Sequence, residues 1–163
     1  KKMAKQKEIK TNAMRMLDKH KIPYEIIQYE CDEFIDGLHT AEKTGAPVEQ
    51  SFKTLVAQGK SKQYYVLVLP IAEEVDLKKA AKAVGEKSIE MIHVKDINQV
   101  TGYIRGGCTA IGMKKQFPTV LSDSARDLPT VIVSGGRIGF QVELEPNALL
   151  KLIRGQFGDI EVK

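Results

Sequence analysis

The sequence predicts a mixed α/β (α+β) fold in one domain, and three observations lead to this prediction. About six to eight short segments with strand character alternate with three to five segments of helical periodicity. The chain has 163 residues, of which 42% are hydrophobic, so it can bury a core. It contains no internal repeat, low-complexity tract or proline-rich linker. We therefore expect a single domain over residues 1–163, with a basic, flexible segment at residues 1–10.

A first helix is predicted close to the N-terminus. Thr11 or Asn12 can cap its first turn, and Pro23 prevents its continuation. Helical spacing places four residues on its buried stripe: Ala13, Met16, Leu17 and His20. A strand is then expected over residues 24–29, and a short helix over residues 40–44.

Glycine marks the ends of most of the following elements. Gly45 is expected to end the short helix. Strands are predicted over residues 52–57 and 64–69, joined by a hairpin turn at residues 59–61. Because residues 64–69 are apolar throughout, this strand should lie centrally in the sheet with both faces buried.

The middle of the chain reads as a helix, a strand and a second, shorter helix. Asp76 can cap the first of these helices and Gly85 can end it. A strand is expected over residues 88–92, and one or two helical turns over residues 95–101, closed by Gly102.

The C-terminal third is expected to return to strands. These are predicted over residues 119–121, 130–133 and 138–144, with a turn at Gly135-Gly136 and an edge strand at residues 160–162. A last helix should begin at Pro146. Its inward residues are predicted to be Ala148, Leu149, Leu152 and Ile153.

The net charge of +4 is unevenly distributed. Residues 1–21 hold eight basic and two acidic residues, a net of +6, so the remaining 17 basic and 19 acidic residues give −2. A nearly neutral body does not favour a wide nucleic-acid surface, and we expect no DNA partner. Met3 can serve as the native first residue, which would leave Lys1 and Lys2 outside the natural chain.

Membrane, secretory and metal-binding classes have no support in the sequence. No run approaches about 18 apolar residues, and no signal peptide is recognisable. Two cysteines are too few for a disulfide framework and fit a reducing cytoplasm, where we expect the protein to act. The three histidines are scattered and no zinc motif occurs, so we expect no metal and no cofactor.

Two features remain as candidates for chemistry. The stretch 102–112 is rich in glycine but matches no phosphate-binding motif; it is either a turn or a loop whose amides approach a ligand. Within it Cys108 is more readily interpreted as a small apolar filler than as a nucleophile, and Cys31 lies among acidic residues that disfavour a thiolate. Lys53 lies in a strand whose two faces both look half buried, so it either points into a cavity or extends to the surface.

Four motifs carry a resemblance to a known family. They are Ser51-Phe52-Lys53-Thr54-Leu55, Leu77-Lys78-Lys79-Ala80-Ala81-Lys82, Thr101-Gly102-Tyr103-Ile104-Arg105-Gly106-Gly107-Cys108 and Val133-Ser134-Gly135-Gly136-Arg137. In this order and spacing the chain resembles the YbaK/EbsC family, whose characterised members include Cys-tRNA(Pro) deacylases. The resemblance implies a curved, mixed, partly closed β-sheet flanked by helices, as in the editing domain of bacterial prolyl-tRNA synthetase.

The resemblance also implies a function. Family members clear cysteine from mischarged Cys-tRNA(Pro) in trans, which is needed because binding alone discriminates poorly between side chains of similar bulk. They need no metal, and the substrate's own thiol is proposed to attack its ester. The implied partners are the aminoacyl-tRNA 3′ end and prolyl-tRNA synthetase. An alanine-specific deacylase and a non-catalytic binding module of the same fold are the alternatives.

The family's functional residues fall on definite positions of this chain. The family lysine corresponds to Lys53, which is expected to orient the substrate and stabilise charge on the carbonyl oxygen. The implied substrate-binding residues are Tyr29, Gly106, Gly107, Cys108, Thr109, Ala110, Ser134, Gly135 and Gly136. The chain departs from the family at Thr109-Ala110, where serine and proline are usual, and we expect a less rigid loop there. Gln141 stands where the family often has aspartate, and no role is carried onto it.

Overall fold

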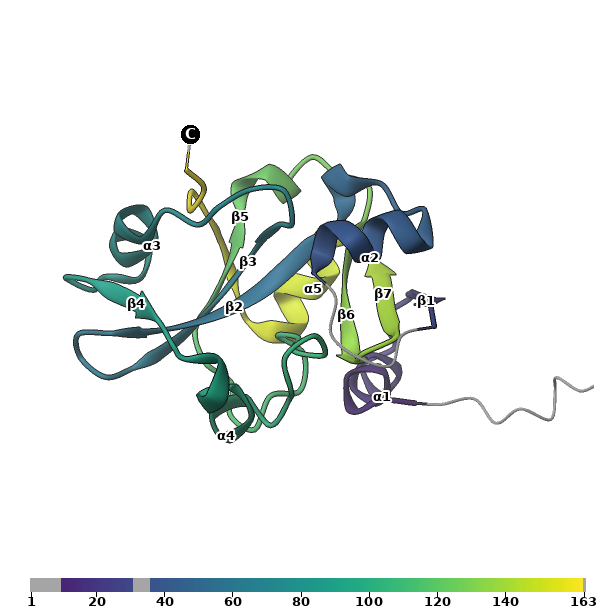
Figure 1. Cartoon of the computed structure of the whole chain (residues 1–163), viewed down its shortest axis with the longest axis horizontal. Helices are drawn as coiled ribbons and strands as arrows, with labels where there is room; N and C mark the ends of the chain where they lie inside the picture. The colour runs from purple at the N-terminus through teal and green to yellow at the C-terminus, as the bar shows by residue number, and fades with distance from the viewer. Residues whose placement is uncertain (1–9, 31–35, 163) are drawn as a thin grey trace, which may run out of the picture.

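A computed structural model describes residues 10–30 and 36–162 of the chain (Figure 1). The expectations for residues 1–9 and for Cys31 lie outside the described residues. The described part contains five α-helices, three short 3-10 helices and eight strands, so the predicted mixed α/β fold is confirmed. None of the helices found in these two ranges is long and apolar enough to cross a membrane.

The elements follow one another with short connections. The helices are α1 (Asn12–Lys19), α2 (Gly37–Thr44), α3 (Leu77–Val84), α4 (Ile97–Thr101) and α5 (Pro146–Ile153), with 3-10 turns η1 (Val48–Gln50), η2 (Val94–Asp96) and η3 (Asp123–Ala125). The strands are β1 (Glu25–Gln28), β2 (Phe52–Gly59), β3 (Tyr64–Pro70), β4 (Ile89–Met91), β5 (Thr119–Ser122), β6 (Val131–Arg137), β7 (Phe140–Leu144) and β8 (Gln156–Gly158).

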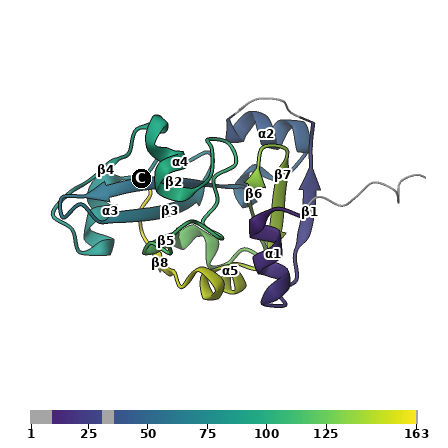
Figure 2. The same cartoon turned by 90° about the horizontal axis from the view of Figure 1, so that it is seen from below.

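The strands form two sheets that meet at one point. A mixed five-stranded sheet has the order β4-β2-β3-β5-β8, and an antiparallel three-stranded sheet has the order β1-β7-β6. Figure 2 shows them as two separate groups, with α1 and α2 around the smaller sheet and α3 beside the larger one. An isolated parallel bridge between Ser51 and Ile132 joins them. The predicted curved sheet is therefore divided into two sheets, and the break lies between β2 and β6.

Local sequence signals explain most of the helix boundaries. The Asp76 carboxylate accepts hydrogen bonds from the N–H groups of Lys78 and Lys79, and Gly85 ends α3 in the left-handed conformation. The Thr11 hydroxyl accepts from the N–H of Met14 and so caps α1. These caps agree with the sequence-based boundaries. The stripe predicted for α1 was partly wrong, because Met14 is buried and His20 is exposed at the C-cap.

Two C-terminal predictions were wrong in position. Gly135-Gly136 does not turn the chain but forms a bulge inside β6, and the turn to β7 follows at Ile138-Gly139. The last edge strand is β8, parallel to β5, rather than residues 160–162. Of those residues, Glu161 makes only an isolated antiparallel bridge with Val75.

The core lies on both faces of β3. Val66 and Val68 contribute to a cluster with α1, α5 and the smaller sheet, and Leu67 and Leu69 to a cluster with α3. All four are at most 1% exposed, which confirms that this strand is central. One edge of β2 pairs with this central strand, and the opposite edge of β2 borders the site described below.

Candidate functional site

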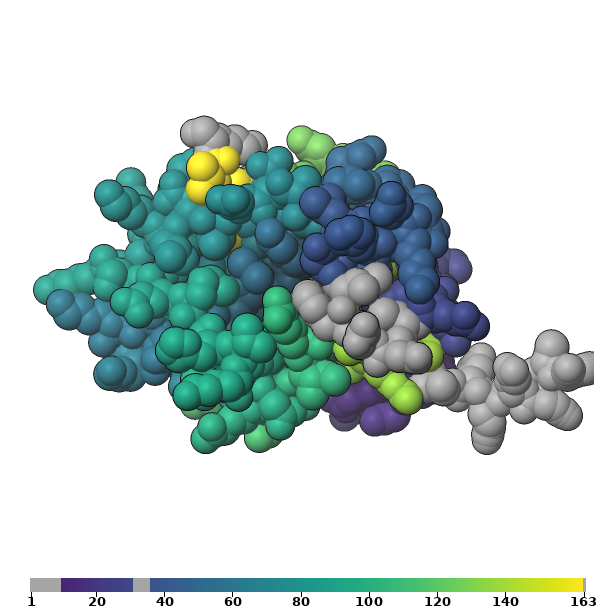
Figure 3. Space-filling model, in the orientation of Figure 1, coloured from purple at the N-terminus to yellow at the C-terminus, as the bar shows by residue number. Residues whose placement is uncertain are grey.

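A cavity of about 560 Å³ opens where the two sheets separate. Beyond the bridge between Ser51 and Ile132, β2 and β6 diverge, and Lys53 and Ser134 lie two residues farther along their strands. Both residues line the cavity. In Figure 3 the surface of β2 is visible at the centre of the face, between α2 above and the green loop after α4 below.

Lys53 is half-buried in this cavity. Its register partner on β3 is Leu69, so it shares a face of β2 with Leu55, as the alternation of the strand predicts. Burial lowers the pKa of its ammonium group, and the carboxylates of Glu74 and Glu73 oppose this by raising it. Lys53 therefore lines the cavity as a half-buried residue whose charge is supported by two carboxylates.

The glycine-rich loop between α4 and β5 forms a second wall. The Tyr103 hydroxyl donates a hydrogen bond of 2.5 Å to the carbonyl of Ile111, and the Asn12 side-chain amide donates one of 2.9 Å to the carbonyl of Gly112. A side chain at Gly107 would place its Cβ 3.0 Å from the Cα of Arg137. These contacts hold the loop against α1 and the end of β6, and the lower rigidity expected at Thr109-Ala110 stays a prediction.

The thiol of Cys108 lines the cavity but is not an activated nucleophile. Burial raises its pKa to about 11, which disfavours the thiolate near neutral pH. Among the residues of 10–30 and 36–162 no basic group lowers this pKa, and a hydrogen bond involving Thr101 lowers it only in part. The described part of the cavity thus agrees with the interpretation of Cys108 as a filler.

The smaller sheet supplies the third wall. Tyr29 follows β1 and donates its backbone N–H to the carbonyl of Gly139, and its side chain lines the cavity. Ser134 and Gln141 are directly opposite each other on β6 and β7, so their side chains share a face. The Oε1 atom of Gln141 is buried and accepts no hydrogen bond from any described residue. Such an atom carries a desolvation cost unless a ligand donates to it.

Half of the site residues predicted from the sequence line the cavity. These are Tyr29, Lys53, Gly106, Cys108 and Ser134. The other five do not form its wall: Gly107, Thr109, Ala110, Gly135 and Gly136. Ala110 is 4% exposed within the core, and Gly136, at a φ of +98°, lies against α1. Gly107, Thr109 and Ala110 belong to the loop, and Gly135 and Gly136 to the bulge of β6, that carry the lining residues.

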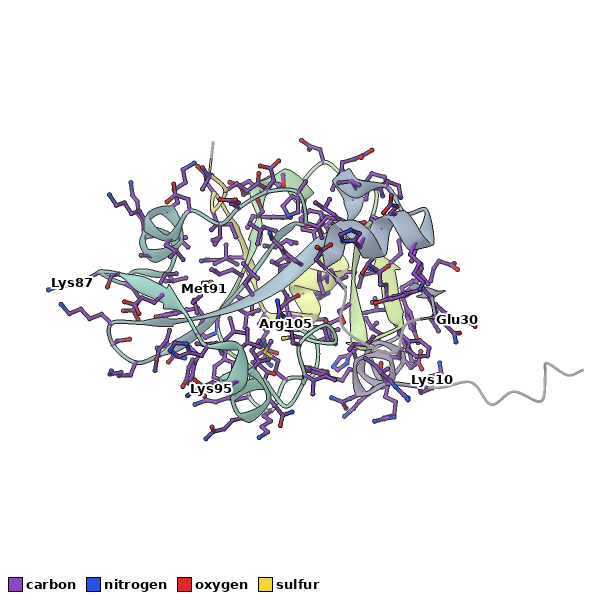
Figure 4. The ribbon with its side chains drawn as sticks, viewed as in Figure 1. Lys10, Glu30, Lys87, Met91, Lys95 and Arg105 are labelled. Carbon is purple, nitrogen blue, oxygen red and sulfur yellow. The ribbon has the colours of Figure 1, made fainter. Side chains whose placement is uncertain are left out.

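Several lining residues were not predicted. Gln141 lines the cavity opposite Ser134, and this position depends on the register between β6 and β7, which the sequence does not reveal. Arg105 and Met91 also line the cavity, and Figure 4 shows them on the central face near β2. The N-terminus of α2 and the segment after β4 complete the wall; neither carries a motif that sequence reasoning could detect. Within the described ranges, no three His, Cys, Asp or Glu side chains are grouped to hold a metal ion.

A family profile and a curated relative both relate the chain to aminoacyl-tRNA editing proteins. The profile of the family described as "Aminoacyl-tRNA editing domain" matches residues 38–152. A curated protein of Enterococcus faecalis, named "Putative Cys-tRNA(Pro)/Cys-tRNA(Cys) deacylase EbsC", is 48% identical over 163 residues, which is 99% of each chain.

Solved structures share the fold at low identity. One is the crystal structure of "a putative trans-editing enzyme for prolyl tRNA synthetase", with a TM-score of 0.80 and 23% identity over 96% of this chain and 100% of that chain. Another is that of "hypothetical protein APE2540", with a TM-score of 0.84 and 15% identity over 93% and 99% of the two chains. At these identities the structures support the fold alone.

Proposed function

The chain belongs to the aminoacyl-tRNA editing domain family, and from this premise we propose that it is a trans-editing deacylase that clears cysteine from Cys-tRNA(Pro), and also from Cys-tRNA(Cys). The observation that carries the proposal is the half-buried Lys53 in a cavity whose described thiol, that of Cys108, has a raised pKa and is therefore neutral. A site with a cation and, among its described residues, no activated nucleophile suits a substrate that supplies its own nucleophile.

The cleavage step proposed is intramolecular. The sulfur of the substrate cysteine bonds to its own ester carbonyl carbon, and the bond from that carbon to the tRNA 3′ oxygen breaks. The thiol proton passes to the departing oxygen, so the products are tRNA with a free hydroxyl and a cyclic thiolactone. Because both reacting groups belong to one molecule, correct orientation alone gives a large acceleration. Substrates without a thiol, such as alanine or proline esters, are not cleaved by this step.

Two side chains of the cavity have distinct roles in this proposal. The Lys53 ammonium stabilises the negative charge that develops on the carbonyl oxygen. The Gln141 Oε1 atom, which lacks a donor among the described residues, accepts a hydrogen bond from the substrate's α-amino group. Together they would hold the two ends of the aminoacyl group and fix the position of its thiol.

The partners follow from the substrate. We assign the aminoacylated 3′ end of tRNA to the cavity and prolyl-tRNA synthetase as the protein that supplies mischarged tRNA. A substrate of translation implies that the protein acts in the cytoplasm.

A deacylation assay on three substrates tests the function. Purified protein is incubated with Cys-tRNA(Pro), Ala-tRNA(Pro) and Pro-tRNA(Pro), and the remaining ester is measured over time. We expect cleavage of the cysteine ester alone. Equal cleavage of the alanine ester would contradict the thiol-assisted step and favour an alanine deacylase. Binding of tRNA without cleavage of any ester would indicate a non-catalytic module.

A further inference from the structure

The backbone groups of β2 point alternately to its two sides. The Ser51 carbonyl accepts from the N–H of Ile71, on the β3 side. The Val56 carbonyl accepts from the N–H of Ile92 at 3.1 Å, and the N–H of Lys60 donates to Ser88 at 3.0 Å, both on the β4 side. Even-numbered residues therefore point toward β4, and the N–H and C=O of Thr54 point to that side as well.

No strand reaches Thr54 on this side within the described residues. The pairing of β4 with β2 covers only residues 57–59, and after Met91 the chain turns into η2. The bridge to β6 is at Ser51. Between these two contacts the cavity occupies the space, and every residue from Phe52 to Val56 lines it. The cavity is thus bordered by an open strand edge with alternating donors and acceptors.

The walls beside this open edge are apolar. Leu55, Ile92 and Ile97 line the cavity, together with two partly exposed residues, Met91 and Val94. Met91 is 38% exposed and Val94 is 53% exposed. Large apolar side chains left uncovered at the rim of a cavity indicate a ligand surface. Apolar faces with a polar edge are the features that a protein offers to a nucleobase.

We propose that the open edge of β2 at Thr54, flanked by Met91 and Val94, is the subsite for the 3′-terminal adenine of the substrate. This inference rests on the proposed function. A backbone C=O accepts from the adenine amino group N6, and a backbone N–H donates to ring atom N1. Because Lys53 immediately precedes Thr54, a base bound at this edge leaves the ribose ester within reach of the flexible lysine side chain.

Hypoxanthine provides a sharp comparison because it keeps the shape of adenine. Its O6 is an acceptor and its N1–H is a donor, so both hydrogen bonds at the strand edge become unfavourable contacts. A site that hydrogen-bonds its ligand strongly rejects an analogue whose groups do not match. By contrast, 7-deazaadenine retains N6 and N1 and should bind as adenine does.

The test uses stable amide analogues and the full chain. The probe is 3′-deoxy-3′-(L-serylamino)adenosine, which has no thiol and no labile ester, together with its inosine and 7-deazaadenosine counterparts. Calorimetric dissociation constants are compared. We expect the 7-deaza analogue to bind within about twofold of the adenosine analogue, and the inosine analogue at least about tenfold more weakly. An inosine analogue within twofold, or a 7-deaza analogue weakened tenfold, would overturn the proposal.

Two valines provide a matched pair of variants. Val94→Ala removes apolar contact at the subsite and should weaken the adenosine analogue by about threefold. Val162→Ala, at a similar exposure of 49% but outside the cavity wall, should leave it unchanged. Equal dissociation constants for the two variants would also contradict the subsite.

The same probes separate this inference from the proposed function. If Cys-tRNA(Pro) is cleaved but the affinity for the seryl analogues does not depend on the base, the adenine subsite is contradicted and the proposed function stands. If the affinity depends on the base but Cys-tRNA(Pro) is not cleaved, the proposed function is contradicted and the adenine subsite stands.

Discussion

At Lys53 two opposing effects act on one ammonium group. Burial in the cavity penalises its charge, and the carboxylates of Glu74 and Glu73 support it. The proposed role requires the charged form, because only an ammonium stabilises a developing negative oxygen. In the proposed role the two glutamates therefore support the charged form of Lys53, although neither lines the cavity.

The pH dependence of ligand affinity follows from this balance. The pKa of Lys53 is lowered, so its contribution to binding is lost as pH rises, at a pH below that of an ordinary lysine. Glu74→Gln removes a group that raises this pKa, so the loss should begin at a lower pH than in the unmodified protein. Calorimetry with the seryl analogue between about pH 7 and 10 measures this shift. The exposed Glu49→Gln variant is the control, and identical profiles for both variants would contradict the coupling.

Gln141 offers a separate test at the same scale. Gln141→Leu removes the buried acceptor that has no described partner. We expect the free energy of unfolding to rise by about 1 kcal/mol, since an unsatisfied polar atom is lost, and affinity for the seryl analogue to fall about tenfold. Chemical denaturation and calorimetry measure the two effects. A variant that loses stability and retains affinity would show that the amide is structural.

At the scale of elements, the glycine-rich loop depends on close backbone contact with the β6–β7 turn. Gly107 lies where a Cβ would be 3.0 Å from the Cα of Arg137 and 3.2 Å from its nitrogen. Both neighbours are backbone atoms, so neither can move away without shifting the turn. The loop and the small sheet consequently position the cavity wall together.

Gly107→Ala should therefore disturb both stability and activity. The added methyl forces the loop away from the turn, at a cost of about 1–3 kcal/mol in the free energy of unfolding. We also expect slower deacylation, because Gly106 and Cys108 on the same loop line the cavity. Thermal unfolding and single-turnover kinetics measure these changes; unaltered values in both would show that the contact is not tight.

The sequence was informative about elements wherever a local rule determines the geometry. Asp76 and Gly85 define the ends of α3 by capping, which depends on neighbours in the chain. The bulge at Gly135-Gly136 was read as a turn because both structures use glycine, and only the pairing of β6 with β7 distinguishes them. The role of Gln141 and the open edge at Thr54 depend on strand register and on where β4 ends, which are set by long-range packing.

In the molecule as a whole, the site lies between two sheets that are joined, within the described part of the chain, by the bridge between Ser51 and Ile132. Residues from β2, β4, β6, β7 and α2, and from the segments after β1 and α4, meet in the cavity, so no single segment carries the function. Three of the four motifs that carry the family resemblance include residues that line the cavity, and the fourth, in α3, packs against the larger sheet. The basic character of the chain is concentrated in its first 21 residues, away from the motifs.

That charge distribution gives a prediction for the N-terminus. Deleting residues 1–9 removes four lysines and one glutamate and retains Lys10, which pairs with Asp18 at 2.8 Å. Affinity for tRNA should fall at low salt, because fewer cations neutralise phosphates, and single-turnover cleavage of bound substrate should be nearly unchanged. Filter binding at several salt concentrations and quench-flow kinetics measure the two quantities. A collapse of the cleavage rate would instead place this segment in the reaction.

One comparison measures directly whether the Lys53 ammonium acts in the proposed removal of cysteine from tRNA. Single-turnover cleavage of Cys-tRNA(Pro) is measured for Lys53→Ala and for Lys60→Ala, an exposed lysine beyond the end of the same strand. Circular dichroism and thermal unfolding establish that both variants are folded. We expect Lys53→Ala to lower the rate by about 10²–10³ and Lys60→Ala to leave it unchanged. A folded Lys53→Ala variant with the full rate would contradict the account.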